Sequence, residues 1–256
     1  MSEIEASFSL LKNQNVLLYV GKGVLFTLII SVIAVMLSIV FGTVLAICRN
    51  YCTTGVTRLL GFLSTFYIEV FRNTPLLLWI FICVVFCPVP QFFSRKMLGL
   101  TSVETKLLWK AAVALVLFES SIIAEIIRGG LNSIAHGQFE AAYSQGFGTV
   151  KTFTLIILPQ AFRSVVPTLL GQVISTIKDS SYLANVATIE LMSRVKTILA
   201  VANRYTGQEN IHTSDVFVLF GLAAVIYFLI NLTLSCIVRG MQAKRKRAAL
   251  RNRLAA

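Results

Sequence analysis

Long apolar runs without a charged residue are the feature that most constrains the fold of this sequence. The clearest run extends from Val24 to Ile47 and is bounded by Lys22 and Arg49. As a helix rising about 1.5 Å per residue, it is longer than the roughly 30 Å hydrocarbon core of a bilayer. The run is therefore predicted to be a membrane-spanning helix over residues 24–47.

The same run carries small residues at every fourth position. They are Ala34, Ser38, Gly42 and Ala46. Residues four apart lie on one face of a helix, and a face of small residues lets another helix backbone approach closely in lipid. We expect this face to pack against protein.

A second apolar region, 59–86, is interrupted by polar residues and a proline. The interruptions are Glu69, Arg72, Asn73 and Pro75. Because Pro75 lacks a backbone donor and disfavours a helical conformation at the preceding residue, we expect a kinked or interfacial lead-in over 59–74 and a span over 75–87. Further spans are expected at about 107–127, 162–183 and 216–238. The chain, 1–256, is thus predicted to be a single all-α integral membrane domain with about five transmembrane helices.

The composition agrees with this fold class. Hydrophobic residues make up 56% of the chain and charged residues only 13%, whereas about a quarter of the residues of a soluble protein are charged. Seven of the 23 Lys and Arg residues fall in the last 18 positions: Arg239, Lys244, Arg245, Lys246, Arg247, Arg251 and Arg253. A basic tail directly after an apolar helix is typical of a cytoplasmic terminus that meets anionic lipid headgroups. Membrane lipid is therefore the expected partner of this charge, and nucleic acid is not.

The basic tail also predicts the orientation of the chain. An odd number of spans places the two termini on opposite faces of the membrane. We expect the N-terminus outside and the C-terminus in the cytoplasm, with the chain passing several times through the membrane. The segment 128–154 is then cytoplasmic.

No catalytic or metal site is expected. The five cysteines form no Cys-x-x-Cys pair, and His136 and His212 lie far from them, so the ligand spacing of a zinc site is missing. Neither paired histidines nor a Ser/His/Asp set is evident. We predict that the chain is not an enzyme; a membrane-embedded enzyme and a self-gated channel are the alternatives from other functional classes.

The polar segment at about 133–160 carries the most specific pattern. Gly146 is predicted to stop a short helix with a left-handed cap, because glycine has no Cβ. Thr149 is expected to cap a second short helix that ends near Pro159. Two short helices that meet at a glycine would make a compact knob, and an ordinary amphipathic connector is the alternative.

The residues of this segment resemble the EAA loop of ABC importer permeases. That pattern is Glu-Ala-Ala, three residues, Gly, then an apolar stretch ending in Leu-Pro, and it stands here as Glu140, Ala141, Ala142, Gly146, Leu158 and Pro159. Further matches resemble the polar amino-acid branch of the family: Phe71-Arg72-Asn73-Thr74-Pro75-Leu76, Ala124-Glu125-Ile126-Ile127-Arg128-Gly129-Gly130, Gly137-Gln138 and Lys178-Asp179-Ser180-Ser181. The matches run from Gly23 to the basic tail, so the resemblance covers nearly the whole chain.

This resemblance implies a type I ABC importer permease fold with a cytoplasmic coupling loop, in the inner membrane of a bacterial cell. It implies that Glu140, Ala141, Ala142, Gly146, Leu158 and Pro159 contact a dimer of ABC ATPase subunits. The other implied partners are a second permease subunit, an extracytoplasmic substrate-binding protein and an amino-acid substrate. The chain contains no Gly-x-x-x-x-Gly-Lys-Ser/Thr loop, so it holds no cofactor, and ATP and Mg are expected on the separate ATPase.

Ionisable residues at membrane depth are the candidates for a substrate path. They are Glu119 and Lys178 with Asp179, accompanied by Ser120, Ser180 and Ser181. Burying such groups in lipid is costly, so they are expected to face the bundle interior or water. An amino-acid zwitterion needs partners of both signs, which Lys178 and a carboxylate supply. A structural ion pair or headgroup snorkelling is the alternative.

The remaining charged residues are expected to be structural. Glu125 and Arg128 lie one turn apart and predict an intrahelical pair, and Arg72 is expected to anchor a helix end to lipid headgroups.

The stretches 118–121 and 158–163 resemble glutamate/aspartate-type permease subunits, which makes these amino acids the expected substrates. Lys178 departs from some of those subunits, and glutamine or another polar amino acid is the alternative.

Overall fold

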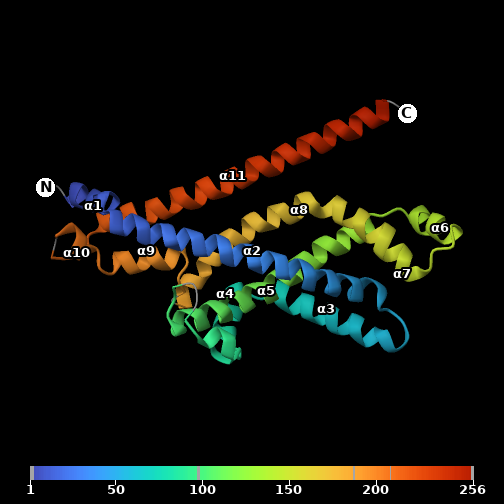
Figure 1. Cartoon of the computed structure of the whole chain (residues 1–256), viewed down its shortest axis with the longest axis horizontal. Coiled ribbons are helices and arrows are strands. Elements are labelled where there is room, and N and C mark those ends of the chain that lie inside the picture. Colours follow the sequence, from blue (N-terminus) through green and yellow to red (C-terminus); the bar gives the residue numbers. More distant parts are fainter. Residues whose placement is uncertain (1–2, 97–98, 187, 208, 255–256) are drawn as a thin grey trace. The chain divides into compact units, whose positions relative to one another are not determined.

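The computed structural model describes residues 3–96, 99–186, 188–207 and 209–254, and it is helical, with no strand among these residues. Four helical stretches are long and apolar enough to cross a membrane (Figure 1). They are Gln14–Tyr51, which is α2, Ser102–Asn132, which is α5, Thr149–Val186, which contains α8 (Leu158–Asp179), and Thr213–Ala243 of α11 (Thr213–Leu254). The all-α membrane fold is therefore confirmed.

A bent pair of helices supplies a fifth candidate span. α3 (Arg58–Arg72) and α4 (Leu76–Phe86) are bent by 110° with respect to each other. The backbone N–H of Asn73 still bonds Glu69 at 3.2 Å, but Pro75 has no N–H to continue the helix. The kink expected at Pro75 is confirmed. α4 has 11 residues, about 16 Å of helix, so it covers only part of a bilayer core by itself.

Short helices fill the remaining segments. They are α1 (Glu3–Lys12), α6 (His136–Ser144), α7 (Thr149–Lys151), α9 (Leu191–Leu199) and α10 (Ala202–Thr206), with 3-10 turns at Gly55–Thr57, Gln91–Ser94 and Ser180–Val186. None of α1, α9 and α10 was predicted from the sequence. Of these, α9 is amphipathic, and it buries Leu191, Val195 and Ile198 on one face.

The chain divides into two compact units, each with its own core. Unit 1 comprises Met1–Ala34, Leu76–Leu115 and Ile174–Ser235, and unit 2 comprises Val35–Pro75, Val116–Val173 and Cys236–Ala256. The core of unit 1 contains Leu10, Val16, Val20, Leu191, Val195, Ile198, Ala202, Leu219 and Ala223. The core of unit 2 contains Leu45, Ala46, Ile68, Ile123, Ala124, Ile127, Leu131, Ile157, Ala161, Val165 and Leu169.

Within unit 2, the small residues of α2 pack closely against α5. A Cβ on Gly42 would lie 2.8 Å from the carbonyl oxygen of Ser120 and 3.0 Å from the nitrogen of Ala124. Both are backbone atoms, so no side chain can move aside to make room. The hydroxyl of Ser38 donates to the carbonyl of Val116 at 3.1 Å, and Ala46 is fully buried. The prediction that this face packs against protein is confirmed.

Within unit 1, a buried carboxylate joins the first helix to the last. The hydroxyl of Ser7 on α1 donates to Asp215 Oδ1 at 2.6 Å, and the backbone N–H of His212 donates to Asp215 Oδ2 at 2.9 Å. Both Ser7 and Asp215 are fully buried. Asp215 therefore stabilises the start of α11 and fixes α1 against it.

Candidate functional site

The EAA segment, residues 133–160, contains α6, and a glycine in the left-handed conformation follows the end of this helix. Gly146 has a φ of +78°. Its N–H bonds the carbonyl of Tyr143 at 2.9 Å, and the N–H of Phe147 bonds the carbonyl of Ala142 at 3.1 Å. This pair of bonds is a Schellman motif, which satisfies the last carbonyls of a helix. The predicted left-handed cap is confirmed.

The helix after Gly146 differs from the prediction in two respects. Gly148, rather than Thr149, is the N-cap residue, and no side-chain bond caps α7. The helix also does not end near Pro159, because α7 continues through a π-helical turn, Thr152–Ile157, directly into α8. The π-helical hydrogen bonds join residues five apart. They precede Pro159, so the N–H that proline lacks does not interrupt a regular α-helical ladder.

The residues of the predicted coupling motif are mostly exposed. Glu140, Ala141, Gly146 and Pro159 are exposed, Leu158 is half-buried, and Ala142 is buried. Exposed apolar side chains accompany them: Tyr143, Phe147, Val150 and Leu155. Phe139 of α6 packs inward against the core of unit 2. The amide of Gln160 donates to Gln138 Oε1 at 2.9 Å and so ties α8 to α6. The segment thus presents a polar and apolar surface on a packed base.

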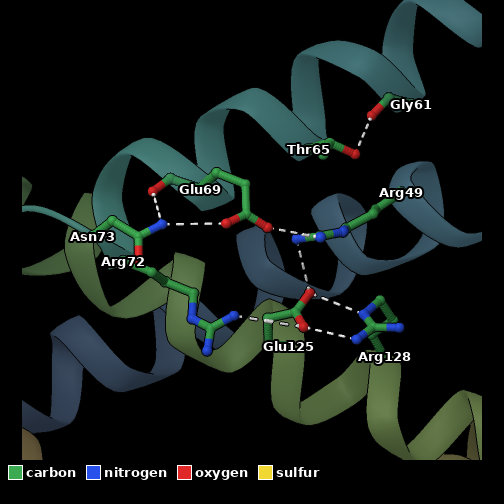
Figure 2. Close-up of polar contacts among 8 residues, drawn as sticks. All are labelled: Arg49, Gly61, Thr65, Glu69, Arg72, Asn73, Glu125 and Arg128. Carbon is green, nitrogen blue, oxygen red and sulfur yellow. Dashed lines mark hydrogen bonds and ion pairs between the residues drawn. The ribbon is translucent and has the colours of Figure 1, made fainter.

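Five charged side chains gather at the ends of α2 and α3 and on α5 (Figure 2). Arg128 donates two hydrogen bonds of 2.9 Å each to the carboxylate of Glu125. Arg49 Nη1 lies 3.1 Å from Glu125 Oε1, and Arg72 Nη1 lies 3.6 Å from Glu125 Oε2. Arg49 also donates to Glu69 Oε1 at 2.8 Å. We call these five residues the Glu125 cluster.

The intrahelical pair predicted from the sequence is therefore present, but it is only one of the ion pairs that Glu125 makes. Glu125 also contacts an arginine on each of two other helices, which the spacing of charges along one helix does not reveal. The interpretation of Arg72 as an anchor to lipid headgroups missed its contact with Glu125. Asn73 adds a bond of 3.2 Å to Glu69 Oε2 and one of 2.8 Å to the Glu69 carbonyl. The C-cap residue of α3, Asn73, is thus hydrogen-bonded to the cluster.

Two candidate residues of the substrate path lie in unit 2. Glu119 is fully buried, and its Oε2 accepts a hydrogen bond of 2.7 Å from the amide of Gln172. The buried hydroxyl of Ser120 donates to the carbonyl of Leu117 at 2.8 Å and lies 3.0 Å from the hydroxyl of Tyr67. Neither Gln172 nor Tyr67 was predicted as a site residue, because no local spacing in the sequence relates them to α5.

The other four candidates lie in unit 1, at the end of α8 and in the turn that follows. Lys178 is exposed, and Asp179 and Ser181 are half-buried. Ser180 is buried, and its hydroxyl donates to the carbonyl of Ile177 at 2.8 Å. The six candidates are therefore divided between the two units.

A second buried carboxylate in unit 1 was missed by the sequence analysis. Glu190 caps α9, since its side chain accepts from the N–H groups of Ser193 at 2.6 Å and Met192 at 2.8 Å. The hydroxyl of Tyr227 donates to it at 3.2 Å. Burial raises the pKa of the Glu190 carboxyl to about 7, and the two backbone hydrogen bonds oppose this only in part. A carboxylate directly before an amphipathic nine-residue helix is the N-cap signal that marks it.

The described residues offer little for metal chemistry. No group of three or more His, Cys, Asp or Glu residues among them is placed to hold a metal ion. The Glu125 cluster and the Glu190 site are built from hydrogen bonds and ion pairs. In the part of the chain that the structure describes, these polar groups therefore join helices and cap a helix end.

Comparisons with known proteins give a consistent result. The family model described as "Binding-protein-dependent transport system inner membrane component" matches residues 38–247. The probable glutamine ABC transporter permease protein GlnP of Bacillus subtilis (strain 168) is 34% identical over 233 residues, which is 91% of this chain and 96% of that protein. The glutamate/aspartate import permease protein GltK of Escherichia coli O157:H7 is 35% identical over 223 residues, which is 86% of this chain and 90% of that protein.

Solved structures share the fold. A crystal structure of an amino acid ABC transporter with histidines has a TM-score of 0.68 at 25% identity, and the match covers 88% of this chain and 94% of that one. An inward-facing structure of the MetNI methionine ABC transporter has a TM-score of 0.62 at 19% identity, with 89% and 98% covered. The second likeness concerns the fold alone.

Proposed function

Because this chain belongs to the family of binding-protein-dependent transport system inner membrane components, we propose that it is the permease subunit of an ATP-driven importer of polar amino acids. The observation that carries the proposal is the EAA segment. Glu140 and Ala141 are exposed on α6, and the left-handed Gly146 redirects the chain toward α8. The segment therefore presents a short exposed helix that a partner protein can bind.

The partner proposed for this surface is a dimer of ABC ATPase subunits. A short helix lying in a groove is a common mode of protein recognition, and Glu140, Ala141, Ala142, Gly146, Leu158 and Pro159 would form that contact. Exposed Val150 and Leu155 would supply apolar area beside it. ATP and Mg belong to the ATPase in this proposal.

The proposed substrate is glutamate or aspartate. The stretches 118–121 and 158–163 support it, as does the similarity to the glutamate/aspartate permease of E. coli. Glutamine is the second candidate, since the similarity to the permease of B. subtilis is comparable. Competition among the three amino acids for uptake by the reconstituted transporter decides between them, and preferential uptake of an apolar amino acid would reject both.

Two further partners complete the proposed transporter. They are a second permease subunit, identical or related, and an extracytoplasmic substrate-binding protein. Purification from membranes tests the set, since a permease brings an ATPase and a second permease with it, whereas a self-gated channel has no need of them.

The proposed orientation places the C-terminus in the cytoplasm and the N-terminus outside. The basic residues in the C-terminal part of α11 support it through the positive-inside rule. The side chains of Lys244, Arg245, Lys246, Arg251 and Arg253 lie outside the described residues. A cytoplasmic reporter fused after Leu254 is expected to be active, and one inserted near Ser94 to report the outside. Activity of both on the same face of the membrane would reject the orientation.

Replacing Gly146 with Val tests the coupling role. A β-branched residue in a left-handed conformation costs about 1–2 kcal/mol, so the chain after α6 should leave in another direction. We expect the Gly146→Val protein to remain in the membrane. We expect the transporter that contains it to lose both amino-acid uptake and the stimulation of ATP hydrolysis by substrate. The matched control is Gly148→Val, because Gly148 has a φ of −71° and a ψ of 162°, which valine adopts freely. Normal stimulated hydrolysis with Gly146→Val would contradict the role.

The proposed substrate path consists of Glu119, Ser120, Lys178, Asp179, Ser180 and Ser181. The hydrogen bond from Gln172 to Glu119 also supports the alternative that Glu119 only secures the fold. Uptake per assembled complex of Glu119→Gln separates the two. A change in apparent affinity on the order of 1–3 kcal/mol is expected for a lost hydrogen bond to a charged group, and unchanged kinetics would remove Glu119 from the path.

A further inference from the structure

One carboxylate in unit 2 is shared by arginines from three helices. Both oxygens of Glu125 are occupied by Arg128 on its own helix, and one is also approached by Arg49 of α2 and the other by Arg72 of α3. An intrahelical pair needs only Arg128. The additional contacts join the C-terminal ends of α2 and α3 to α5 (Figure 2).

The residues next to this cluster belong to the core on which the EAA segment rests. The core residue Ile68 directly precedes Glu69, and Ala124 directly precedes Glu125. Ala46 lies one helical turn before Arg49. From the EAA side, Ile157 and Ala161 enter the same core, with Phe139 and Phe153 packed against it. The ring of Tyr51 at the end of α2 meets Phe153 edge-on, with centroids 5.1 Å apart. The helix ends and the EAA segment are thus parts of one packed body.

We propose that Glu125 is a positioning residue for coupling: it fastens the ends of α2 and α3 to α5, so that a displacement of the EAA segment moves all of them together. This inference rests on the proposed function. Packed cores shift between discrete arrangements rather than deforming continuously. Apolar attraction has no preferred direction, whereas the hydrogen bonds and ion pairs of a carboxylate shared by three guanidinium groups also fix the direction of each contact.

The charges of the cluster explain why Glu125 holds this role rather than Glu69. The cluster has three arginines and two glutamates, so it keeps a positive excess. Glu69 contacts one arginine and is about half exposed, whereas Glu125 contacts all three and its side chain is only 16% exposed. Without Glu125, the three guanidinium groups would repel one another across the helix ends.

The test measures uptake per ATP hydrolysed by the transporter reconstituted in liposomes with its ATPase, partner permease and binding protein. For Glu125→Gln, we expect ATP hydrolysis close to that of the unsubstituted transporter and uptake per ATP lower by about five-fold or more, as for a lost coupling between sites. The matched control is Glu104→Gln. It removes a carboxylate that also faces an arginine, Arg194 at 3.9 Å, from the same helix but in unit 1. We expect its ratio to be unchanged.

A charge exchange separates the three-helix contact from the intrahelical pair. The double variant Glu125→Arg with Arg128→Glu restores a bridge within α5 but leaves Arg49 and Arg72 facing a cation. We expect it to remain uncoupled. Recovery of the normal ratio would show that only the pair with Arg128 matters, and the proposal would be overturned.

A second variant covers the case in which Glu125→Gln does not assemble. Arg72→Gln removes only the 3.6 Å contact, from a side chain that is 42% exposed, so the protein is expected to fold. A lower ratio supports the proposal and an unchanged ratio overturns it. The unsubstituted transporter tests the proposed function separately, because absence of ATP-dependent uptake there would reject the function, whatever the variants do.

Discussion

Glu125 in unit 2 and Glu190 in unit 1 are both largely buried glutamates, but their surroundings differ. Three guanidinium groups from three helices surround Glu125. Glu190 instead accepts two backbone N–H groups and a phenol hydroxyl. Cations favour the charged form of a carboxylate, whereas burial favours the protonated form, and the neutral donors around Glu190 oppose the effect of its burial only in part. One residue type therefore joins helices through ion pairs in one unit and serves as a titratable helix cap in the other.

The largest expected difference is in stability. Glu125→Gln leaves three arginines close together without their shared carboxylate, and we expect a loss of roughly 3 kcal/mol, at the low end for breaking a buried pair because the arginines are partly exposed. Glu190→Gln keeps one oxygen, which can accept from only one of the two backbone N–H groups, but it removes a charge that is costly to bury, so a loss of about 1 kcal/mol is expected. Thermal unfolding of the two purified variants at pH 8 measures the difference. Equal losses would show that the two sites are not distinct in kind.

The second expected effect is a pH dependence that belongs to Glu190 alone. Its pKa is raised from 4.5 to about 7 in the folded chain, so the folded chain retains a proton that the unfolded chain releases. Stability is therefore full below pH 4.5, falls as the pH rises from 4.5 to 7, and is constant above. The shift corresponds to a loss on the order of 3 kcal/mol.

Unfolding temperature measured across pH 4.5 to 8 checks this prediction, with Glu190→Gln as the comparison. The variant has no carboxyl at this position and is expected to lose that part of the pH dependence. If both proteins show the same profile, another group titrates, and the contrast between the two glutamates fails.

Local rules predicted several features correctly. The chain bends next to Pro75, which lacks an N–H, Gly146 takes the left-handed conformation because it lacks a Cβ, and Gly42 lies where two backbones nearly touch. Each follows from the covalent structure of one residue and its immediate neighbours. The EAA pattern was recognised for the same reason, since its spacing is local.

Features that depend on distant residues were missed or misjudged. The expected helix end near Pro159 is wrong, because π-helical turns before the proline allow the chain to continue into α8. The arginines around Glu125 come from separate helices, and the amide that meets Glu119 comes from α8. No periodicity within one segment reports such contacts. The amphipathic spacing of α9 was present in the sequence, but long apolar spans dominated the interpretation.

The sequence by itself determined that this chain is a helical membrane protein and which family it resembles. Lipid offers no partner to a bare backbone, so long apolar runs have few alternatives to the helix. Only the tertiary structure decided which buried charges meet. A carboxylate is stabilised by whatever donors surround it, and at Glu125 and Glu190 several of those donors come from helices far apart in the chain.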